Sequence, residues 1–292
     1  MHDANAMKAQ KRTVKLVVIS DVHLGTRGCQ TKPLLQYLKS IRPEILILNG
    51  DIIDIWQFKK RYWPAAHMKV IKEIMSMAAK KTKVYYITGN HDEVLRKFAN
   101  SSIGNIHIVN QLVLELDHKK IWFFHGDVFD VIMQHSKWLA KIGAIGYDSL
   151  IALNLVVNNI SRFFGKGNVS LSKKIKENVK SAVKYINNFE NTAAKLAATK
   201  GYDAVVCGHI HHPDIRQITT DLGSIAYLNS GDWIENLSAL EYHNKQWHIY
   251  RHPISDNHFP APAPQTSFEG IREIEDLKHK ELFKIMLKEF DS

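Results

Sequence analysis

The sequence predicts a mixed α/β sandwich whose loops meet along one rim. Short apolar runs repeatedly end in Asp, His or Asn, which is typical of buried strands that stop at a ligand-binding sheet edge. Segments of helix length separate the early runs, as in βαβ units, whereas strands and turns follow His209. Polar residues from several strand ends are therefore expected to share one edge.

The expected elements follow one another along the chain. Five apolar runs predict strands at residues 14–19, 44–48, 83–87, 121–124 and 204–207. Helices are expected at residues 32–41 and 67–80, between the first three strands. Beyond His209, further strands are expected at residues 215–219, 224–228, 238–242 and 246–250.

Residues 135–200 interrupt this alternation and indicate a helical insertion. The segment has no strand signal, and its eleven Lys and Arg against three Asp and Glu account for most of the net charge of +10. One main domain is thus expected at residues 13–252, with the insertion inside it. Residues 253–292 are expected to form a stiff proline-rich linker and an amphipathic helix.

Composition narrows the class of protein. The net charge of +10 favours an anionic partner such as a nucleotide, a nucleic acid or an acidic membrane surface. Cys29 and Cys207 make no disulfide framework, and no apolar stretch reaches the ~18 residues that span a bilayer. The first residues also lack the apolar core of an export signal. We therefore expect a cytoplasmic protein.

The polar residues at the strand ends are of the types that bind transition metals. Two carboxylates, one amide and four imidazoles are candidate ligands: Asp21, His23, Asp51, Asn90, His125, His209 and His211. This mixture suits Mn, Fe, Zn or Co, whereas an all-oxygen set would indicate Mg or Ca. Seven ligands suffice for two ions if one carboxylate bridges them, and two ions assist displacement at a phosphoryl group. A single DxH or HxH motif is more often a turn with a surface histidine, but five short motifs of this kind in order, each ending an apolar run, favour a metal centre.

The order D-x-H, G-D, G-N-H-D, H-G-D and G-H-x-H resembles the calcineurin-like metallophosphoesterase superfamily over residues 14–250. The resemblance implies an αββα sandwich with a helical lid insertion and two divalent ions. The implied ligand roles are one ion on Asp21, His23 and His211, the other on Asn90, His125 and His209, and a bridge at Asp51. His91 would stabilise phosphoryl oxygens or protonate the leaving group, with Asp92 orienting its ring.

Within the superfamily, the segments "GDIIDIW" and "CGHIHHP", the insertion and the chain length are similar to the UDP-2,3-diacylglucosamine diphosphatase group. That resemblance implies hydrolysis of a pyrophosphate bond to UMP and a lipid sugar phosphate in lipid A biosynthesis, at the inner face of the inner membrane. It makes residues 135–200 a lid over acyl chains, although a solvated basic face over a core stripe would explain the same pattern. The candidate substrate-binding residues are Arg96, Lys173, Lys176 and Lys180.

One residue departs from this group and keeps other functions open. The best-known diphosphatases resembling this chain have arginine at the position of His91. Generic phosphoesterases have histidine there, as this chain does. A phosphodiesterase of another nucleotide, phospholipid or nucleic acid is therefore the alternative, although the apolar residues of the insertion favour an amphiphilic substrate over nucleic acid. A non-catalytic scaffold is the alternative from another class, and the complete ligand set weighs against it. The oligomeric state is not indicated.

Overall fold

The structure is a computed structural model that describes residues 11–55, 62–129 and 171–253, without the side chains of residues 171–182. The chain divides into two compact units, Met1–Asp127 with Ala193–Ser267 and Val128–Thr192 with Phe268–Ser292. The described part of the first unit holds both β-sheets, and that of the second holds most of helix α6 (Leu171–Thr199). The predicted C-terminal helix lies outside the described residues.

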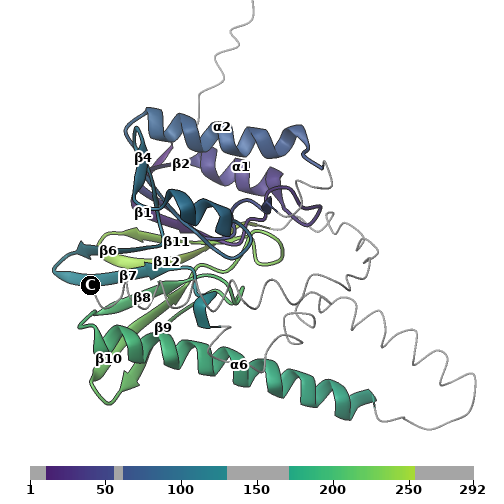
Figure 1. Cartoon of the computed structure of the whole chain (residues 1–292), viewed down its shortest axis with the longest axis vertical. Helices are drawn as coiled ribbons and strands as arrows, with labels where there is room; N and C mark the ends of the chain where they lie inside the picture. The colour runs from purple at the N-terminus through teal and green to yellow at the C-terminus, as the bar shows by residue number, and fades with distance from the viewer. Residues whose placement is uncertain (1–10, 56–61, 130–170, 254–292) are drawn as a thin grey trace, which may run out of the picture. The chain divides into compact units, whose positions relative to one another are not determined.

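A seven-stranded sheet forms the first strand layer (Figure 1). Its order is β12 (Gln246–Arg251), β11 (Ser238–His243), β1 (Arg12–Ile19), β2 (Ile41–Asn49), β3 (Lys83–Ile87), β5 (Ile106–Val109) and β4 (Ser101–Ile103). β1, β2, β3 and β5 are parallel, and β11 joins β1 antiparallel. Helices α1 (Thr31–Ser40) and α2 (Ala65–Ala79) provide the crossovers that parallel neighbours require.

A five-stranded sheet forms the second strand layer. Its order is β6 (Gln111–Leu116), β7 (Lys119–Phe124), β8 (Ala204–Cys207), β10 (Gly223–Asn229) and β9 (Asp214–Thr220). β7 pairs with β8 in parallel, although the whole insertion separates them in the sequence. The carboxyl ends of these two strands therefore reach the same edge of the sheet.

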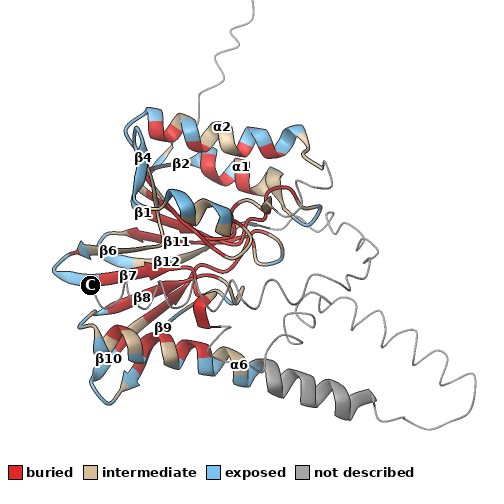
Figure 2. Ribbon diagram, in the orientation of Figure 1, coloured by how far each residue is buried: buried red, intermediate tan, exposed pale blue. Residues whose placement is uncertain are grey.

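Alternate strand residues enter two cores, which fixes the layer order (Figure 2). In β1, Val17 and Ile19 join the core beneath α1 and α2, whereas Leu16 and Val18 join a core that includes Phe123 of the other sheet. Because side chains alternate along a strand, β1 is buried on both faces and forms a continuous apolar run.

The far face of the second sheet is covered as well. Trp122 and Phe124 of β7 are buried and stack at 4.0 Å between ring centroids, and the Tyr202 ring lies 6.0 Å from Trp122. The last turns of α6, with Ala193 and Ala197 fully buried, belong to this same unit. This arrangement confirms the predicted αββα sandwich.

The predicted strands and helices of the first unit are all present, with ends that shift by at most a few residues. The prediction missed β4, β5, β6 and the short helix η2 (Glu93–Phe98), whose side chains are mostly exposed or half-buried and form no apolar run. Residues 171–199 form one helix of the predicted insertion, whose boundaries stay a prediction because residues 130–170 are not described. None of the described helices combines the length and hydropathy needed to cross a membrane.

Candidate metal centre

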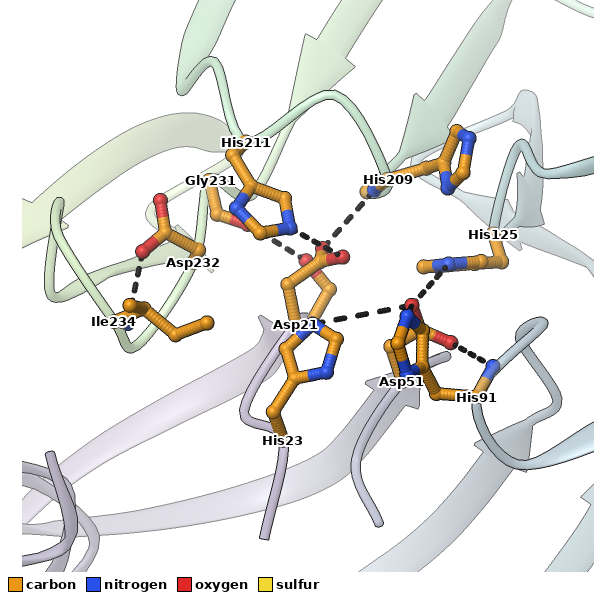
Figure 3. Close-up of polar contacts among 12 residues, drawn as sticks. Asp21, His23, Asp51, His91, His125, His209, His211, Gly231, Asp232 and Ile234 are labelled. Atoms are coloured by element: carbon orange, nitrogen blue, oxygen red, sulfur yellow. Dashed lines mark hydrogen bonds and ion pairs between the residues drawn. The ribbon is translucent and has the colours of Figure 1, made fainter. Parts of the chain in front are cut away.

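The ends of β1, β2, β7 and β8 bring six of the seven predicted ligands together (Figure 3). β1, β2 and β3 of the first sheet and β7 and β8 of the second are each followed by polar residues. In strand order these residues are Asp21 with His23, Asp51, Asn90, His125, and His209 with His211. The sandwich thus collects side chains that are distant in the sequence, as the pattern of polar strand ends predicted.

Asp21, His23 and His211 form the first cluster, with one ligand atom from each within 4.8 Å of the others. Nε2 of His211 lies 3.2 Å from Oδ1 of Asp21, while Oδ2 of Asp21 accepts a hydrogen bond from the backbone N–H of His209 at 3.0 Å. The Asp21 carboxylate is fully buried, but the His211 side chain is 37% exposed. This cluster is therefore open to solvent on the His211 side.

Asp51, His125 and His209 form the second cluster, also with ligand atoms within 4.8 Å. Nε2 of His125 lies 3.3 Å from Oδ2 of Asp51. Nδ1 of His125 donates to the Asn49 carbonyl at 2.9 Å, because a carbonyl oxygen can only accept, and Nε2 is left to face the cluster. The His125 side chain is 0% exposed, whereas His209 is half-buried, as His211 is in the first cluster.

Asp51 connects the two clusters. Its Oδ2 atom also lies 3.9 Å from Nε2 of His23 and 4.0 Å from Nε2 of His91, and these three residues form a further group of ligand type. Its Oδ1 atom accepts a hydrogen bond from the backbone N–H of His91 at 2.9 Å. A carboxylate placed between two ligand clusters has the position that a bridging ligand needs.

Several buried polar atoms at these clusters fit bound cations. Among the described residues, Oδ1 of Asn90 is buried without a hydrogen-bond partner, while Oδ1 of Asp21 and Nε2 of His125 have only an ion-pair contact, at 3.2 and 3.3 Å. A buried polar atom left without a partner costs ~1–3 kcal/mol. Ligands bound at about 2.1 Å from an ion lie roughly 3 Å from one another, which the contacts at Asp21 and Asp51 resemble. The donor set therefore suits a dinuclear centre.

The ligand loops hold their residues in a strained backbone conformation. Asp21, His23, Asp51, His209 and His211 have φ angles from 52° to 66°. Left-handed backbone of this kind costs roughly 1–2 kcal/mol per non-glycine residue. Hydrogen bonds between the loops offset this cost, such as that from the His23 N–H to the Asp51 carbonyl at 2.9 Å. Strained residues of this kind cluster at functional sites.

Two motif glycines allow the ligands to approach one another. A Cβ atom on Gly50 would lie 2.3 Å from the His125 ring, and one on Gly89 would lie 2.2 Å from Oδ1 of Asp51. Any side chain at either position would displace a ligand. The glycines of the G-D and G-N-H-D motifs are thus explained by contact distance.

The loop after β10 braces the first cluster, and the sequence analysis missed it. The Trp233 N–H donates to the Asp21 carbonyl at 3.1 Å, and Nδ2 of Asn236 donates to the His211 carbonyl at 2.9 Å. Nδ2 of Asn236 also contacts Oδ2 of Asp232, whose Oδ1 accepts three backbone hydrogen bonds from residues 234–236. The signal was another polar strand end, because the apolar run of β10 leads into "NSGDW".

Without ions, the carboxylates and imidazoles of the clusters shift one another's pKa. Burial lowers the pKa of His211, but the Asp21 carboxylate outweighs burial and raises this pKa to about 9. Burial raises the pKa of Asp21, but His211 outweighs it and lowers this pKa to about 2. Burial also opposes the charged form of His125, yet Asp51 raises the pKa of His125 well above its usual range. In His23 burial prevails and lowers the pKa to about 4.

His91 lies beside Asp51, and Asp54 orients its ring. Nδ1 of His91 is 3.2 Å from Oδ2 of Asp54, whereas Nε2 is on the side of Asp51. Burial lowers the pKa of His91, but the hydrogen bond to Asp54 and the charge of Asp51 outweigh burial and raise it.

Asp92, the residue predicted to orient His91, is hydrogen-bonded by groups of its surroundings. The Asp92 carboxylate accepts hydrogen bonds from the backbone N–H groups of Gly89 and Ile52 and from the Tyr86 hydroxyl, at 2.6, 3.0 and 2.6 Å. Asp92 therefore shapes the G-N-H-D loop. The carboxylate at hydrogen-bond distance from Nδ1 of His91 is that of Asp54, and the role of Asp92 toward His91 stays a prediction.

Of the predicted substrate-binding residues, the structure describes the side chain of Arg96 alone. Arg96 donates to Asp127 at 2.5 Å, and both side chains are mostly buried. Lys173, Lys176 and Lys180 are part of α6, but their side chains lie outside the described part of the chain. Their contact with substrate stays a prediction.

Comparison with known proteins agrees with this geometry. The model of the calcineurin-like phosphoesterase family matches residues 14–213. The UDP-2,3-diacylglucosamine hydrolase of Aliivibrio fischeri (strain MJ11) is 25% identical over 242 residues, which cover 81% of this chain and 98% of the relative. Proteins of the same name from Aeromonas salmonicida (strain A449) and Blochmanniella floridana are 24% and 27% identical, over 76% and 70% of this chain and 87% and 83% of their own length. With clusters suited to two metal ions, the chain is a metal-dependent hydrolase, and it belongs to the calcineurin-like phosphoesterase family.

Proposed function

We propose that this protein hydrolyses the pyrophosphate bond of UDP-2,3-diacylglucosamine to UMP and 2,3-diacylglucosamine 1-phosphate, in lipid A biosynthesis. The observation that carries the proposal is the pair of ligand clusters connected by Asp51. Relatives named UDP-2,3-diacylglucosamine hydrolase align with this chain over as much as 98% of their length, which supports the choice of substrate. The net charge of +10 also suits a substrate with two phosphates.

Each ligand has a role in this proposal. Asp21, His23 and His211 would hold one ion, Asn90, His125 and His209 the other, and Asp51 both. The ions would supply Lewis-acid charge to the phosphoryl oxygens and lower the pKa of water. The mixed imidazole and carboxylate set suits Mn, which we propose as the ion, and it also accommodates Fe, Zn or Co.

His91 would act on the phosphoryl group directly. Asp54 accepts a hydrogen bond from Nδ1 and so directs Nε2 toward the side of Asp51. The raised pKa of His91 favours the form that carries a proton on Nε2. From this position the ring can stabilise phosphoryl oxygens or protonate the leaving oxygen.

The proposal includes peripheral contact with an anionic membrane at the cytoplasmic face, because a diacylated substrate resides in a bilayer. The eleven basic residues within 135–200 support this contact. Flotation with phosphatidylglycerol vesicles tests it. The wild type should float more than a variant with Lys173, Lys176 and Lys180 changed to Glu, and equal flotation would contradict the contact.

Turnover by metal-stripped protein restored with Mn tests the function. UDP-2,3-diacylglucosamine in detergent micelles and soluble bis-p-nitrophenyl phosphate would be assayed side by side. UMP release that is lost in Asp51→Ala and kept in Asp221→Ala, a change at an exposed turn residue, would support the proposal. Turnover of the soluble ester alone would reject the lipid substrate and keep the hydrolase.

His91 favours a second candidate, a phosphodiesterase of another nucleotide or phospholipid. A histidine paired with Asp54 can serve as a proton donor for many leaving groups, whereas the best-known diphosphatases resembling this chain have arginine there. Replacement of His91 by Arg distinguishes the two candidates. Retained cleavage of the lipid diphosphate would favour the first, and loss of all turnover would favour the second.

A further inference from the structure

Arg27 lies on the loop that immediately follows the ligand His23. This loop turns tightly, because the N–H and Oγ1 of Thr26 both donate to the His23 carbonyl, at 3.1 and 2.9 Å. Such a turn keeps the Cα atoms of residues 23 and 26 within about 7 Å of each other. The Cα atom of Arg27 is one residue farther, so it lies within roughly 11 Å of that of His23. The long Arg27 side chain therefore starts near the metal centre.

The first turn of α2 and the residues just before it hold this loop. The Gly25 N–H donates to Nδ1 of the buried His67 at 2.8 Å. A Cβ atom on Gly25 would lie 3.2 Å from the Trp63 ring, and the Trp63 and His67 rings are 5.6 Å apart between centroids. These contacts thus fix the backbone of the loop that carries Arg27.

The Arg27 guanidinium lies over an aromatic ring, and no described carboxylate lies beside it. Cζ of Arg27 lies 5.5 Å from the centroid of the Tyr62 ring. Arg27 is exposed, and within the described ranges no carboxylate lies at ion-pair distance from it. Arg12 and Arg96, in contrast, are paired with acidic side chains at 2.8 and 2.5 Å. A ring face orients a guanidinium and leaves its charge and its N–H donors available to a ligand.

We propose that Arg27, oriented by Tyr62, binds the second phosphate of a diphosphate substrate, the phosphate that the metal centre does not hold. This inference rests on the proposed hydrolysis of a diphosphate. The planar guanidinium can donate two parallel hydrogen bonds to phosphate oxygens.

Calorimetric titration of the Mn-loaded full-length protein tests the site. The probes are α,β-methylene-UDP, which has two phosphates and resists cleavage, and UMP, which has one. The wild type should bind the first more tightly, and Arg27→Ala should weaken that binding roughly 10- to 100-fold while UMP loses less. Arg27→Lys should be intermediate because lysine lacks the planar fork. Tyr62→Ala should lose roughly threefold.

The matched control is Arg42→Ala, because Arg42 is exposed near the start of β2, at the opposite end of the strand from Asp51. It should leave both affinities unchanged, and circular dichroism melting should show that each variant is folded. An unchanged affinity ratio in Arg27→Ala, or a wild type that binds both probes equally, would overturn the proposal. If Arg27→Ala loses affinity for the diphosphate but the wild type does not cleave UDP-2,3-diacylglucosamine, the proposed substrate fails and the Arg27 site stands.

Discussion

The two ligand clusters have similar chemistry and similar burial, with two buried residues and one half-buried histidine each, but they differ in how the protein holds His125 and His211. In the second cluster, the ring of His125 is 0% exposed and is anchored through its own Nδ1 atom. In the first, His211 is 37% exposed and is anchored by Asn236 through its backbone carbonyl. One ligand is thus fixed through its ring inside the core, whereas the other is fixed through its backbone by the loop after β10.

Asp51→Ala would break both clusters at once and should have the largest effect. Turnover of bis-p-nitrophenyl phosphate should fall roughly a thousandfold, because several kcal/mol of charge stabilisation depend on the ions. Steady-state kinetics and metal analysis of the purified variant would measure this. A variant that keeps two ions and a tenth of the wild-type kcat would show that Asp51 does not connect the clusters functionally.

Truncation of one histidine from each cluster would measure the difference in how His125 and His211 are held. His125→Ala should lower the unfolding free energy of the metal-stripped protein by ~2–4 kcal/mol, because it leaves a cavity and an unpaired Asn49 carbonyl. His211→Ala should cost less, ~1–2 kcal/mol, because water can replace the partly exposed ring although the buried Asp21 carboxylate loses its cationic partner. Urea denaturation gives both values, and metal analysis should find one ion lost in each variant. Equal losses of stability would remove the distinction.

The parts of the centre that could be predicted from sequence are those that follow from buried strands. β1, β2 and β8 are continuous apolar runs because both of their faces are covered, and polar residues that follow such runs must lie at a sheet edge. The parallel pairing of β7 and β8 then places His125 beside the histidines after β8. The grouping of these candidate ligands could therefore be predicted from the sequence.

The remaining features depend on contacts between loops, which no local pattern encodes. Asp54 and Asp92 are both acidic residues close to His91 in the fold, and only the structure shows that Asp54 is the one at hydrogen-bond distance from Nδ1 of the ring. The left-handed conformations of the ligands arise from hydrogen bonds between loops rather than from residue type. The bracing role of Asn236 likewise appears only when β10 is placed beside β8.

The pH dependence of ion binding would sharpen the comparison between clusters. Below its pKa of about 9, His211 carries a proton that an ion must displace. Affinity at the first cluster should therefore rise roughly a hundredfold between pH 7 and 9 and then level off. At the second cluster affinity should also rise with pH, because Asp51 raises the pKa of His125. Calorimetry of Mn binding in buffers of different ionisation enthalpy would count the protons, and proton release that persists at pH 9.5 at the first cluster would contradict the assignment.

Asn236→Ala should have the smallest effect and would test whether the surface loop alone sets the first cluster. Loss of the donor to the His211 carbonyl should free a strained residue, so affinity for the ion at the first cluster should fall roughly tenfold, while the second is unchanged. Asn105→Ala is the matched control, because Nδ2 of Asn105 also donates to a backbone carbonyl at 2.9 Å, that of Ala78, away from the ligands. Equal losses of ion affinity in the two variants would mean that general destabilisation weakens binding. A loss confined to Asn236→Ala would show that a loop bearing none of the predicted ligands sets the affinity of the first cluster.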